Sequence, residues 1–249
     1  MKIMIFGNGL IGSRLAARLT EAGHEVAALG RSDGIDTTTG HGLADALMGA
    51  EVAVDLTNSP SWSDEDVLAF FRDSTSHLLA AEQAAGVKHH VILSIVGADR
   101  LPDAGYLRAK VAQEQLTEAG PVPFTIVRST QFFEFVPGIA DAATVGDKVH
   151  ATPGRLQPIA SSDVVTQLAE IVTAPALNRT VEIAGPEPIG IDTLVRRLFA
   201  VTHDTRAVIT DPHATYFGAE LDAWLLTPAP DSGAWIAPTP YDVWLDTRR

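Results

Sequence analysis

A tyrosine and a lysine four residues apart are the first side chains in this sequence that could do chemistry. Tyr106 and Lys110 lie in a segment with helical spacing, so both fall on one face of that helix. A phenol with a pKa near ~10 is a poor proton donor at neutral pH, and a neighbouring ammonium stabilises the phenolate and lowers that pKa. We predict that Tyr106, tuned by Lys110, exchanges the proton that accompanies hydride transfer at a carbonyl. The alternative is a chance pair on an exposed helix.

A glycine-rich segment offers a second chemistry, the binding of phosphate. Gly7-Asn8-Gly9-Leu10-Ile11-Gly12 follows an apolar run and opens an amphipathic helix, the context in which G-x-G-x-x-G binds dinucleotides. The first glycine permits a tight turn, the second lets the backbone approach a pyrophosphate, and the third allows close packing. The free N–H groups of the helix start attract the phosphates. We predict that all six residues contact a cofactor; the alternative is a structural turn.

The residues after the second predicted strand bear on which dinucleotide binds. Arg31 and Ser32 stand where an NAD-preferring site usually has an acidic residue for the ribose 2′-hydroxyl. A guanidinium and a hydroxyl suit a 2′-phosphate, so we predict NADP(H), with NAD(H) as the alternative. Asp33 and Asp36 follow closely and argue in the opposite direction, and Arg31 could be a solvated turn residue.

Two further segments follow predicted strands at the edge of the sheet where ligands bind. Thr57 and Asn58 come after the third strand and are predicted to contact the nicotinamide-side ribose; the alternative is a plain turn before a helix. Gln131, Phe132 and Phe133 come after the fifth strand and are predicted to line an apolar substrate pocket. The alternative for these phenylalanines is a place in the core.

Alternating strands and helices must position these residues. Near-continuous apolar runs predict buried strands at residues 2–6, 25–29, 51–56, 90–94 and 124–128, with a brief further strand near 34–37. Helical spacing predicts helices at residues 10–22, 43–48, 64–85 and 107–119. This repetition implies right-handed crossovers and an α/β fold with a doubly wound, Rossmann-like parallel sheet.

The sequence pattern changes after residue 130, where prolines and glycines separate shorter elements. We predict a helix at about residues 162–173, a strand at 180–184 and a helix at 191–201. We therefore predict a dinucleotide-binding core at residues 1–130 and a small C-terminal substrate-side lobe at 131–249. The lobe is partly integrated with the core, so both form a single structural domain.

Composition excludes several classes of function. The 249 residues include no cysteine, which removes disulfides, iron–sulfur clusters and thiol nucleophiles. The net charge of −13 argues against a nucleic-acid partner. The histidines show no metal-binding spacing, and Ser63 followed by three acidic residues predicts a capped helix start, so we predict no metal. No apolar run approaches the ~18 residues of a membrane span, and no signal peptide is evident, so we predict a cytoplasmic protein without a membrane partner.

Together these motifs resemble the atypical, NmrA-like branch of the short-chain dehydrogenase/reductase superfamily. The resemblance covers roughly residues 1–170. It implies that Tyr106 is the acid/base, that Lys110 also binds the nicotinamide ribose, and that Ser94 orients the substrate carbonyl. Ser94 stands at a strand end, slightly before the usual position of that hydroxyl. The residues that carry the resemblance are Gly7, Gly9 and Gly12, Gly30-Arg31-Ser32, Val91-Ile92-Leu93-Ser94, Tyr106 with Lys110, Thr125-Ile126-Val127-Arg128, Gln131-Phe132-Phe133, Leu156-Gln157-Pro158-Ile159-Ala160 and Asp163-Val164-Val165.

The sequence therefore predicts an NADP(H)-dependent oxidoreductase that moves a hydride to or from a small, largely apolar carbonyl or quinone. Because the branch includes members that bind the dinucleotide without turnover, the main alternative is a non-catalytic NADP(H)-binding redox sensor with a protein partner. A third interpretation is a nucleotide-sugar epimerase or dehydratase with tightly bound NAD. The acidic composition favours a neutral or apolar substrate over a strongly anionic one.

Overall fold

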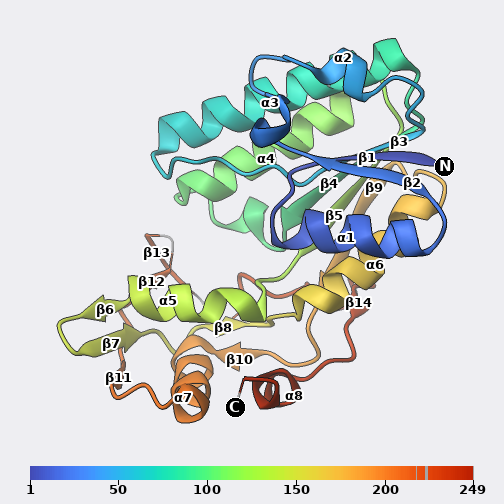
Figure 1. Ribbon diagram of the computed structural model, residues 1–249. Coiled ribbons are helices and arrows are strands. Elements are labelled where there is room, and N and C mark those ends of the chain that lie inside the picture. The colour runs from blue at the N-terminus through green and yellow to red at the C-terminus, as the bar shows by residue number, and fades with distance from the viewer. Residues whose placement is uncertain (217, 222–223, 249) are drawn as a thin grey trace. The chain divides into compact units, whose positions relative to one another are not determined.

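A seven-stranded parallel sheet forms the centre of the fold (Figure 1). The computed structural model describes residues 1–216, 218–221 and 224–248. The strand order is β14-β9-β5-β4-β3-β1-β2, which confirms the predicted Rossmann-like α/β fold. The strands are β1 (Lys2–Phe6), β2 (Glu25–Leu29), β3 (Val52–Asp55), β4 (His89–Ile95), β5 (Phe124–Ser129), β9 (Arg179–Ala184) and β14 (Trp235–Ile236).

The chain forms two compact units, and each is discontinuous in sequence. The first unit comprises Met1–Ser94, Gly105–Arg128 and Val165–Val181, and the second comprises Ile95–Ala104, Ser129–Val164 and Glu182–Arg249. This arrangement differs from a single boundary near residue 130. The reason lies in the helix α6 (Ser161–Thr173), whose apolar side chains Val165, Leu168 and Val172 are buried and return the chain to the first unit.

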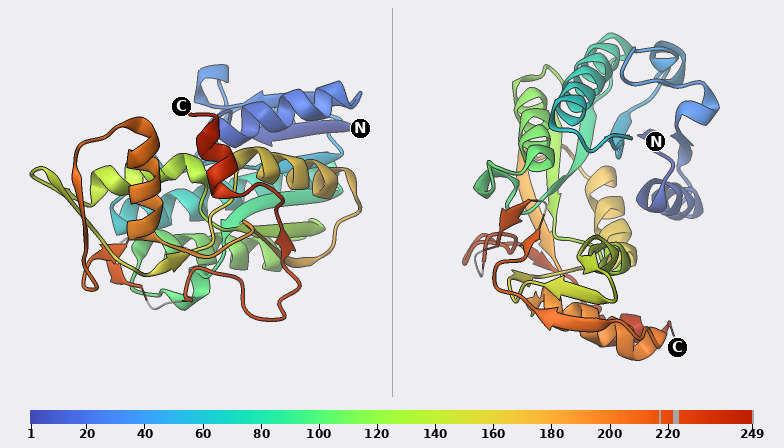
Figure 2. Two further views of the ribbon diagram at one scale, coloured as in Figure 1. Left: turned by 90° about the horizontal axis from the view of Figure 1, so that it is seen from below. Right: turned by 90° about the vertical axis from the view of Figure 1, so that its left-hand side faces the viewer.

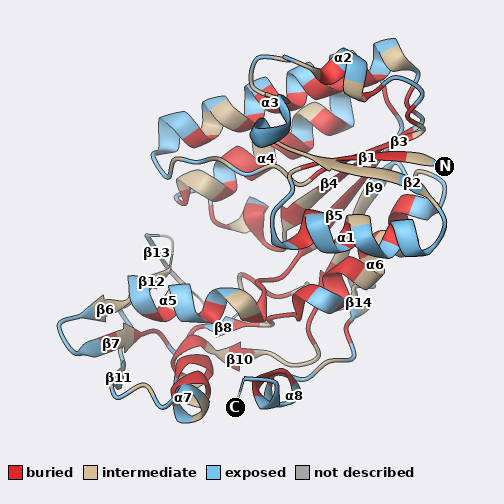
Figure 3. Cartoon of the chain, viewed as in Figure 1, coloured by how far each residue is buried: buried red, intermediate tan, exposed pale blue. Residues whose placement is uncertain are grey.

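Helices cover both faces of the sheet in the first unit. They are α1 (Leu10–Glu21), α2 (Leu43–Ala46), α3 (Asp64–Ala85), α4 (Gly105–Ala119) and α6. In Figure 1 and in the right-hand view of Figure 2, α3 and α4 lie side by side on one face, and α1 and α6 lie on the other. The double cover explains why β1 and β3 are mostly apolar, and Figure 3 shows both strands as mostly buried.

Local signals set the ends of the longest helix, α3. Ser63 is its N-cap, and the side-chain oxygen of Ser63 accepts a hydrogen bond from the N–H of Asp66 at 3.3 Å. Acidic side chains fill the first turn, and Gly86 closes the helix in the left-handed conformation with φ +74°. These contacts confirm that the acidic segment after Ser63 is a capped helix start.

The second unit contains smaller sheets and its own aromatic core. Its strands are β6 (Thr144–Val145), β7 (Lys148–Ala151), β8 (Arg155–Leu156), β10 (Ile189–Gly190), β11 (Ala207–Thr210), β12 (Thr215–Tyr216) and β13 (Ala219–Glu220), and its helices are α5 (Val136–Ala142), α7 (Ile191–Thr202) and α8 (Tyr241–Asp246). The ring of Phe133 lies 5.0 Å from that of Tyr241 and 5.6 Å from that of Trp244. The strand predicted near residues 34–37 is only an isolated bridge between Asp36 and His41.

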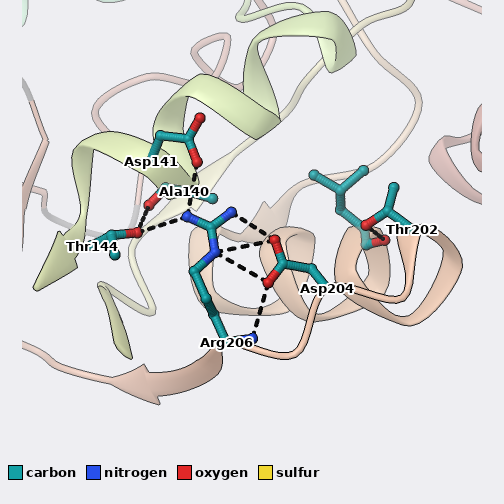
Figure 4. Close-up of polar contacts among 7 residues, drawn as sticks. Ala140, Asp141, Thr144, Thr202, Asp204 and Arg206 are labelled. Carbon is teal, nitrogen blue, oxygen red and sulfur yellow. Dashed lines mark hydrogen bonds and ion pairs between the residues drawn. The ribbon is translucent and has the colours of Figure 1, made fainter. Parts of the chain in front are cut away.

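An arginine ties several segments of the second unit together (Figure 4). The guanidinium of Arg206 donates to both carboxylate oxygens of Asp204 and, through Nη1, to Asp141 at 2.8 Å and Thr144 at 3.0 Å. It also lies 4.8 Å from the ring centroid of Phe199 on α7. Because Asp141 belongs to α5, these contacts fasten α5 and β6 to the segment between α7 and β11.

Within the described ranges, no helix has the length and apolar character needed to cross a membrane. The same part of the chain holds no group of three or more His, Asp or Glu side chains arranged to bind a metal ion.

Candidate functional site

Strand register brings the ends of three strands to one edge of the sheet in the first unit. Phe6 at the end of β1 pairs with Leu29 of β2 and with Asp55 of β3. The N–H of Gly7 donates to the carbonyl of Leu29, and the N–H of Leu56 donates to the carbonyl of Phe6, both at 2.8 Å. The turns after these strands therefore begin side by side, where open α/β sheets bind their ligands.

The three glycines of the loop between β1 and α1 have different surroundings. Gly7 has φ +106°, and a Cβ there would lie 2.6 Å from the carbonyl oxygen of Leu56. A Cβ on Gly12 would lie 1.8 Å from the carbonyl oxygen of Gly7. A Cβ on Gly9 would meet no atom within 4 Å, and no side chain caps the start of α1. Gly7 and Gly12 thus serve close packing, whereas Gly9 and the helix start leave room and N–H donors for a pyrophosphate.

The other predicted loop residues differ in what they can offer a ligand. The side-chain amide of Asn8 donates to Asp33 Oδ2 at 3.3 Å and lies 3.5 Å from Ser32 Oγ. Leu10 is exposed at the start of α1, whereas Ile11 is buried. The side chain of Ile11 therefore belongs to the core, and only its backbone could meet a cofactor.

The turn after β2 presents charges of both signs. The carboxylate of Asp33 accepts hydrogen bonds from the N–H of Gly30 at 2.9 Å and from the hydroxyl of Ser32 at 3.3 Å. The side chain of Arg31 is 59% exposed, and its Nε lies 3.9 Å from the carboxylate of Asp36. The predicted Arg31 and Ser32 are thus accompanied by a fixed carboxylate, which works against a 2′-phosphate.

Tyr106, the predicted acid–base group, lies at the same sheet edge. Its hydroxyl donates to Asn58 Oδ1 at 2.9 Å, so the structure brings these two predicted residues together. The Tyr106 ring lies edge-on to Phe71 and 5.4 Å from the ring of Trp62. Burial raises the pKa of Tyr106 to about 12, opposite to the predicted lowering. The phenol is therefore held protonated at neutral pH.

Lys110 is buried, and its ammonium is engaged on the inner side of α4. The Nζ donates to Gln113 Oε1 and lies 4.4 Å from the ring centroid of Phe71. Gln113 Nε2 donates to Asp55 Oδ2 at 2.8 Å. Burial lowers the pKa of Lys110 to about 8, although the carboxylates of Asp55 and Glu114 act in the opposite direction. Of the two residues, Lys110 is thus the one whose pKa moves toward neutral pH, whereas that of Tyr106 moves away from it.

Sequence reasoning missed Asp55 and Gln113, although each left a signal. Asp55 is a lone acidic residue that ends the otherwise apolar strand β3 and is 2% exposed. Gln113 follows Lys110 by three residues, so helical geometry puts the two side chains on one face. A buried acid at a sheet edge and an amide beside a lysine are features of a polar site.

The turn after β3 connects this buried carboxylate with Tyr106. Asp55 Oδ1 accepts hydrogen bonds from the N–H of Thr57 at 2.9 Å and from its hydroxyl at 2.6 Å. Asn58 Oδ1 accepts both the N–H of Ser59 and the hydroxyl of Tyr106, each at 2.9 Å. Thr57 thus forms a turn before a helix, which is the alternative to contact with the ribose, whereas Asn58 also holds the phenol of Tyr106.

Ser94 lies at the carboxyl end of β4, between β3 and β5 in the sheet. The residue is 2% exposed, and its hydroxyl oxygen has no hydrogen-bond partner in the described part of the chain. An unsatisfied buried hydroxyl costs free energy unless something binds it. Ser94 thus offers a free hydrogen-bonding group at the ligand edge of the sheet.

The three residues predicted to line the substrate pocket belong to the second unit. Phe133 lies in the aromatic core with Tyr241 and Trp244. Phe132 stacks on the half-exposed Phe135, with ring centroids 5.0 Å apart, and the carbonyl of Gln131 accepts the N–H of Ile159. Phe133 thus takes the core place that the sequence left as the alternative.

Comparisons with known proteins identify the fold. No protein-family model and no curated protein matches the sequence. Solved structures do match. A short-chain dehydrogenase/reductase superfamily protein from Agrobacterium tumefaciens with bound NAD is 17% identical over 100% of this chain and 96% of that one, with a TM-score of 0.72. dTDP-4-dehydrorhamnose reductase from Bacillus anthracis in complex with NADP is 13% identical over 99% and 98%, with a TM-score of 0.77.

A third similar structure, UDP-glucose 4-epimerase from Thermotoga maritima with UDP-glucose, is 15% identical over 100% of this chain and 97% of that one, with a TM-score of 0.73. At such identities the likeness establishes the fold, which is the one these superfamily proteins share. It does not single out the NmrA-like branch.

Proposed function

We propose that this protein is an NADP(H)-dependent oxidoreductase that moves a hydride to or from a small, largely apolar carbonyl or quinone. The main support is the hydroxyl of Tyr106, which Asn58 holds at the sheet edge where the glycine loop also begins. A proton donor beside a dinucleotide-binding edge is the arrangement that carbonyl reduction requires.

The residues of the first unit suit a nicotinamide dinucleotide. Gly9 and the uncapped start of α1 would receive the pyrophosphate, and Arg31 with Ser32 would receive a 2′-phosphate. When bound, the cofactor would supply or accept the hydride. The complexes of similar structures with NAD or NADP support this assignment.

The raised pKa of Tyr106 keeps the phenol protonated in the free protein, which is the state that carbonyl reduction needs. A phenol with a pKa of about 12 keeps its proton until a substrate oxygen gains negative charge. Tyr106 would then donate that proton, and the ammonium of Lys110, one helical turn away, would stabilise the phenolate left behind. Ser94, whose buried hydroxyl lacks a partner in the described structure, would bind the substrate oxygen.

An exposed aromatic ring beside Tyr106 supports a flat, apolar substrate. The side chain of Trp62 is 66% exposed, and its ring lies 5.4 Å from that of Tyr106, tilted by 38°. Indole surface at a ligand edge can stack on a planar ring. We therefore favour quinones and aromatic carbonyls among the substrates.

Two other functions each have an observation in their favour. A nucleotide-sugar epimerase or dehydratase with bound NAD is favoured by the likeness to UDP-glucose 4-epimerase and by the carboxylate of Asp33. A non-catalytic NADP(H) sensor is favoured by the engagement of Lys110 with Gln113 rather than with the phenol.

Cofactor titration followed by turnover assays distinguishes these functions. We expect NADPH to bind more tightly than NADH, and a panel of quinones and aromatic aldehydes to be reduced with consumption of NADPH. We expect Tyr106→Phe to keep cofactor binding and to lose most turnover. Turnover that survives in Tyr106→Phe would refute the acid–base assignment. NADPH binding without any turnover would favour the sensor, and conversion of UDP-sugars would favour the epimerase.

A further inference from the structure

A buried chain of polar side chains connects Lys110 with the turn that holds Tyr106. Lys110 Nζ donates to Gln113 Oε1, Gln113 Nε2 donates to Asp55 Oδ2, and Asp55 Oδ1 accepts both hydrogen bonds from Thr57. Lys110, Gln113 and Asp55 are each at most 4% exposed. These hydrogen-bonded side chains therefore lie inside the first unit, between the sheet and α4.

Hydrogen-bond chemistry gives this chain a fixed direction. An ammonium can only donate, so the amide of Gln113 must turn its oxygen to Lys110 and its nitrogen to Asp55. The carboxylate can only accept, which fixes the same orientation from the other end. Reversing the amide would place its N–H donors against the ammonium. One rotamer of Gln113 is thus selected by both neighbours, and this rotamer fixes the position of Nζ.

The charges around Lys110 show that Asp55 is its balancing carboxylate. Glu114, the other acid that acts on Lys110, is already bound by Arg128, with N–O distances of 2.6 and 2.9 Å. Besides Asp55 on β3, two largely buried ion pairs lie on the packed elements: Glu82 on α3 with His90 on β4, and Glu114 on α4 with Arg128 on β5. Asp55 also raises the pKa of His90. A buried ammonium requires such a partner, because burial strongly disfavours an unpaired charge.

We propose that Gln113 and Asp55 are the positioning residues of the site, which hold the ammonium of Lys110 and the Tyr106-bearing turn in one fixed arrangement. Gln113 acts through Lys110. Asp55 acts on both the ammonium of Lys110 and the turn that holds Tyr106. It reaches the turn because Thr57 binds its second oxygen and the adjacent Asn58 holds the phenol. The consequence for catalysis rests on the proposed function, whereas the effect of Gln113 and Asp55 on the position and pKa of Lys110 does not.

Three variants and a control test this arrangement. Asp55→Asn keeps the shape but sets an amide against the amide of Gln113, and Gln113→Met removes both hydrogen bonds. The double variant Asp55→Asn with Gln113→Glu restores an unbroken series of hydrogen bonds. The introduced amide can donate to the introduced carboxylate, and that carboxylate can accept from Lys110. Gln115→Met on the exposed side of α4 is the matched control.

The first readout needs no cofactor, because nitrogen-15 NMR can follow the titration of Lys110 in the free protein. We expect the pKa of Lys110, about 8 in the unmodified protein, to fall in both single variants. We expect the double variant to bring it back to that value or above, and Gln115→Met to leave it unchanged. Single variants that fold and titrate like the unmodified protein would overturn the proposal, as would a double variant that titrates like the singles.

The second readout is the pH dependence of kcat and KM with NADPH. We expect kcat to fall about tenfold or more in each single variant, as the loss of a hydrogen bond to a charged group predicts, and to recover in the double variant. If the single variants lost kcat only because they were less stable, the double variant would not regain it. If the unmodified protein turns nothing over, the proposed function fails, while the titration of Lys110 still decides this inference.

Discussion

Under the proposed function, two charged residues on one turn would decide between NADPH and NADH. Arg31 offers an exposed guanidinium 3.9 Å from Asp36, whereas Asp33 presents a carboxylate that accepts the N–H of Gly30. A 2′-phosphate is attracted by the first and repelled by the second, and a 2′-hydroxyl can donate to the second. We therefore expect the preference for one cofactor to depend on the balance between these two side chains.

Substitution of each charge should move the preference in opposite directions. We expect Arg31→Ala to weaken NADPH binding about fivefold and to leave NADH binding nearly unchanged, because an exposed charge pair is worth about 1 kcal/mol. We expect Asp33→Asn to strengthen NADPH binding by a similar factor. Fluorescence titration at one fixed ionic strength measures both. An unchanged ratio of the two affinities in Arg31→Ala would remove the basis for an NADP(H) preference.

The glycines of the same edge provide a matched pair of variants. A Cβ on Gly12 would collide with the backbone oxygen of Gly7 at 1.8 Å, so Gly12→Ala should lower the midpoint of thermal unfolding and abolish dinucleotide binding. Gly9 has open space around its Cβ position, so Gly9→Ala should fold normally and weaken only the binding. Equal losses of stability in the two variants would contradict the different roles assigned to these glycines.

At the scale of helices and strands, periodicity predicted what depends on local patterns. The five strands of the first unit and the cap at Ser63 follow from neighbouring residues. By contrast, β14 has only two residues and α8 only six, too few for a period to show. The pairing of Gln113 with Asp55 was equally hidden, because the two residues lie 58 positions apart and only folding brings them together.

Strand β4 carries two buried histidines with opposite properties. His89 Nε2 lies 2.8 Å from Thr125 Oγ1, and the same hydroxyl oxygen accepts the N–H of Leu177. Burial lowers the pKa of His89 to about 4. For His90, burial acts to lower the pKa, but the carboxylate of Glu82 at 2.9 Å outweighs it and raises the pKa. The two rings thus contact different elements, Thr125 on β5 and Glu82 on α3.

Acid should therefore destabilise the fold through His89. Between pH 6.5 and about 4 the unfolded chain binds a proton at this residue and the folded chain does not, so the free energy of unfolding falls as the pH falls through this range. We expect His89→Gln to flatten this slope, measured by urea unfolding at several pH values. The exposed His77→Gln on α3 is the control. An unchanged slope in His89→Gln would show that this ring is protonated in the folded protein.

At the scale of the whole molecule, each compact unit has its own means of cohesion. The first has a two-sided apolar sheet, and the second has an aromatic core and the contacts of Arg206. The hydrogen bonds that Arg206 donates to Asp204 and Asp141 raise the pKa of Arg206 further, so its charge is permanent. A guanidinium that binds both oxygens of one carboxylate cannot be matched by an ammonium.

Loss of Arg206 should therefore loosen the second unit selectively. We expect Arg206→Lys and Arg206→Ala to lower the midpoint of thermal unfolding and to speed hydrogen exchange in residues 141–151 and 204–210. Exchange in β1 and β3 should stay unchanged. The exposed Arg179→Ala is the control. Uniform acceleration over both units would show instead that they unfold as one.

The interleaving of the two units has a consequence for the growing chain on the ribosome. The first unit needs residues up to Val181, since Val165–Val181 belongs to it. The part of the sheet that α6 covers therefore stays exposed while the intervening part of the second unit is made. A nascent chain stopped near residue 130 would carry the glycine loop and Tyr106 yet lack α6 and β9. Such a fragment should engage chaperones instead of folding.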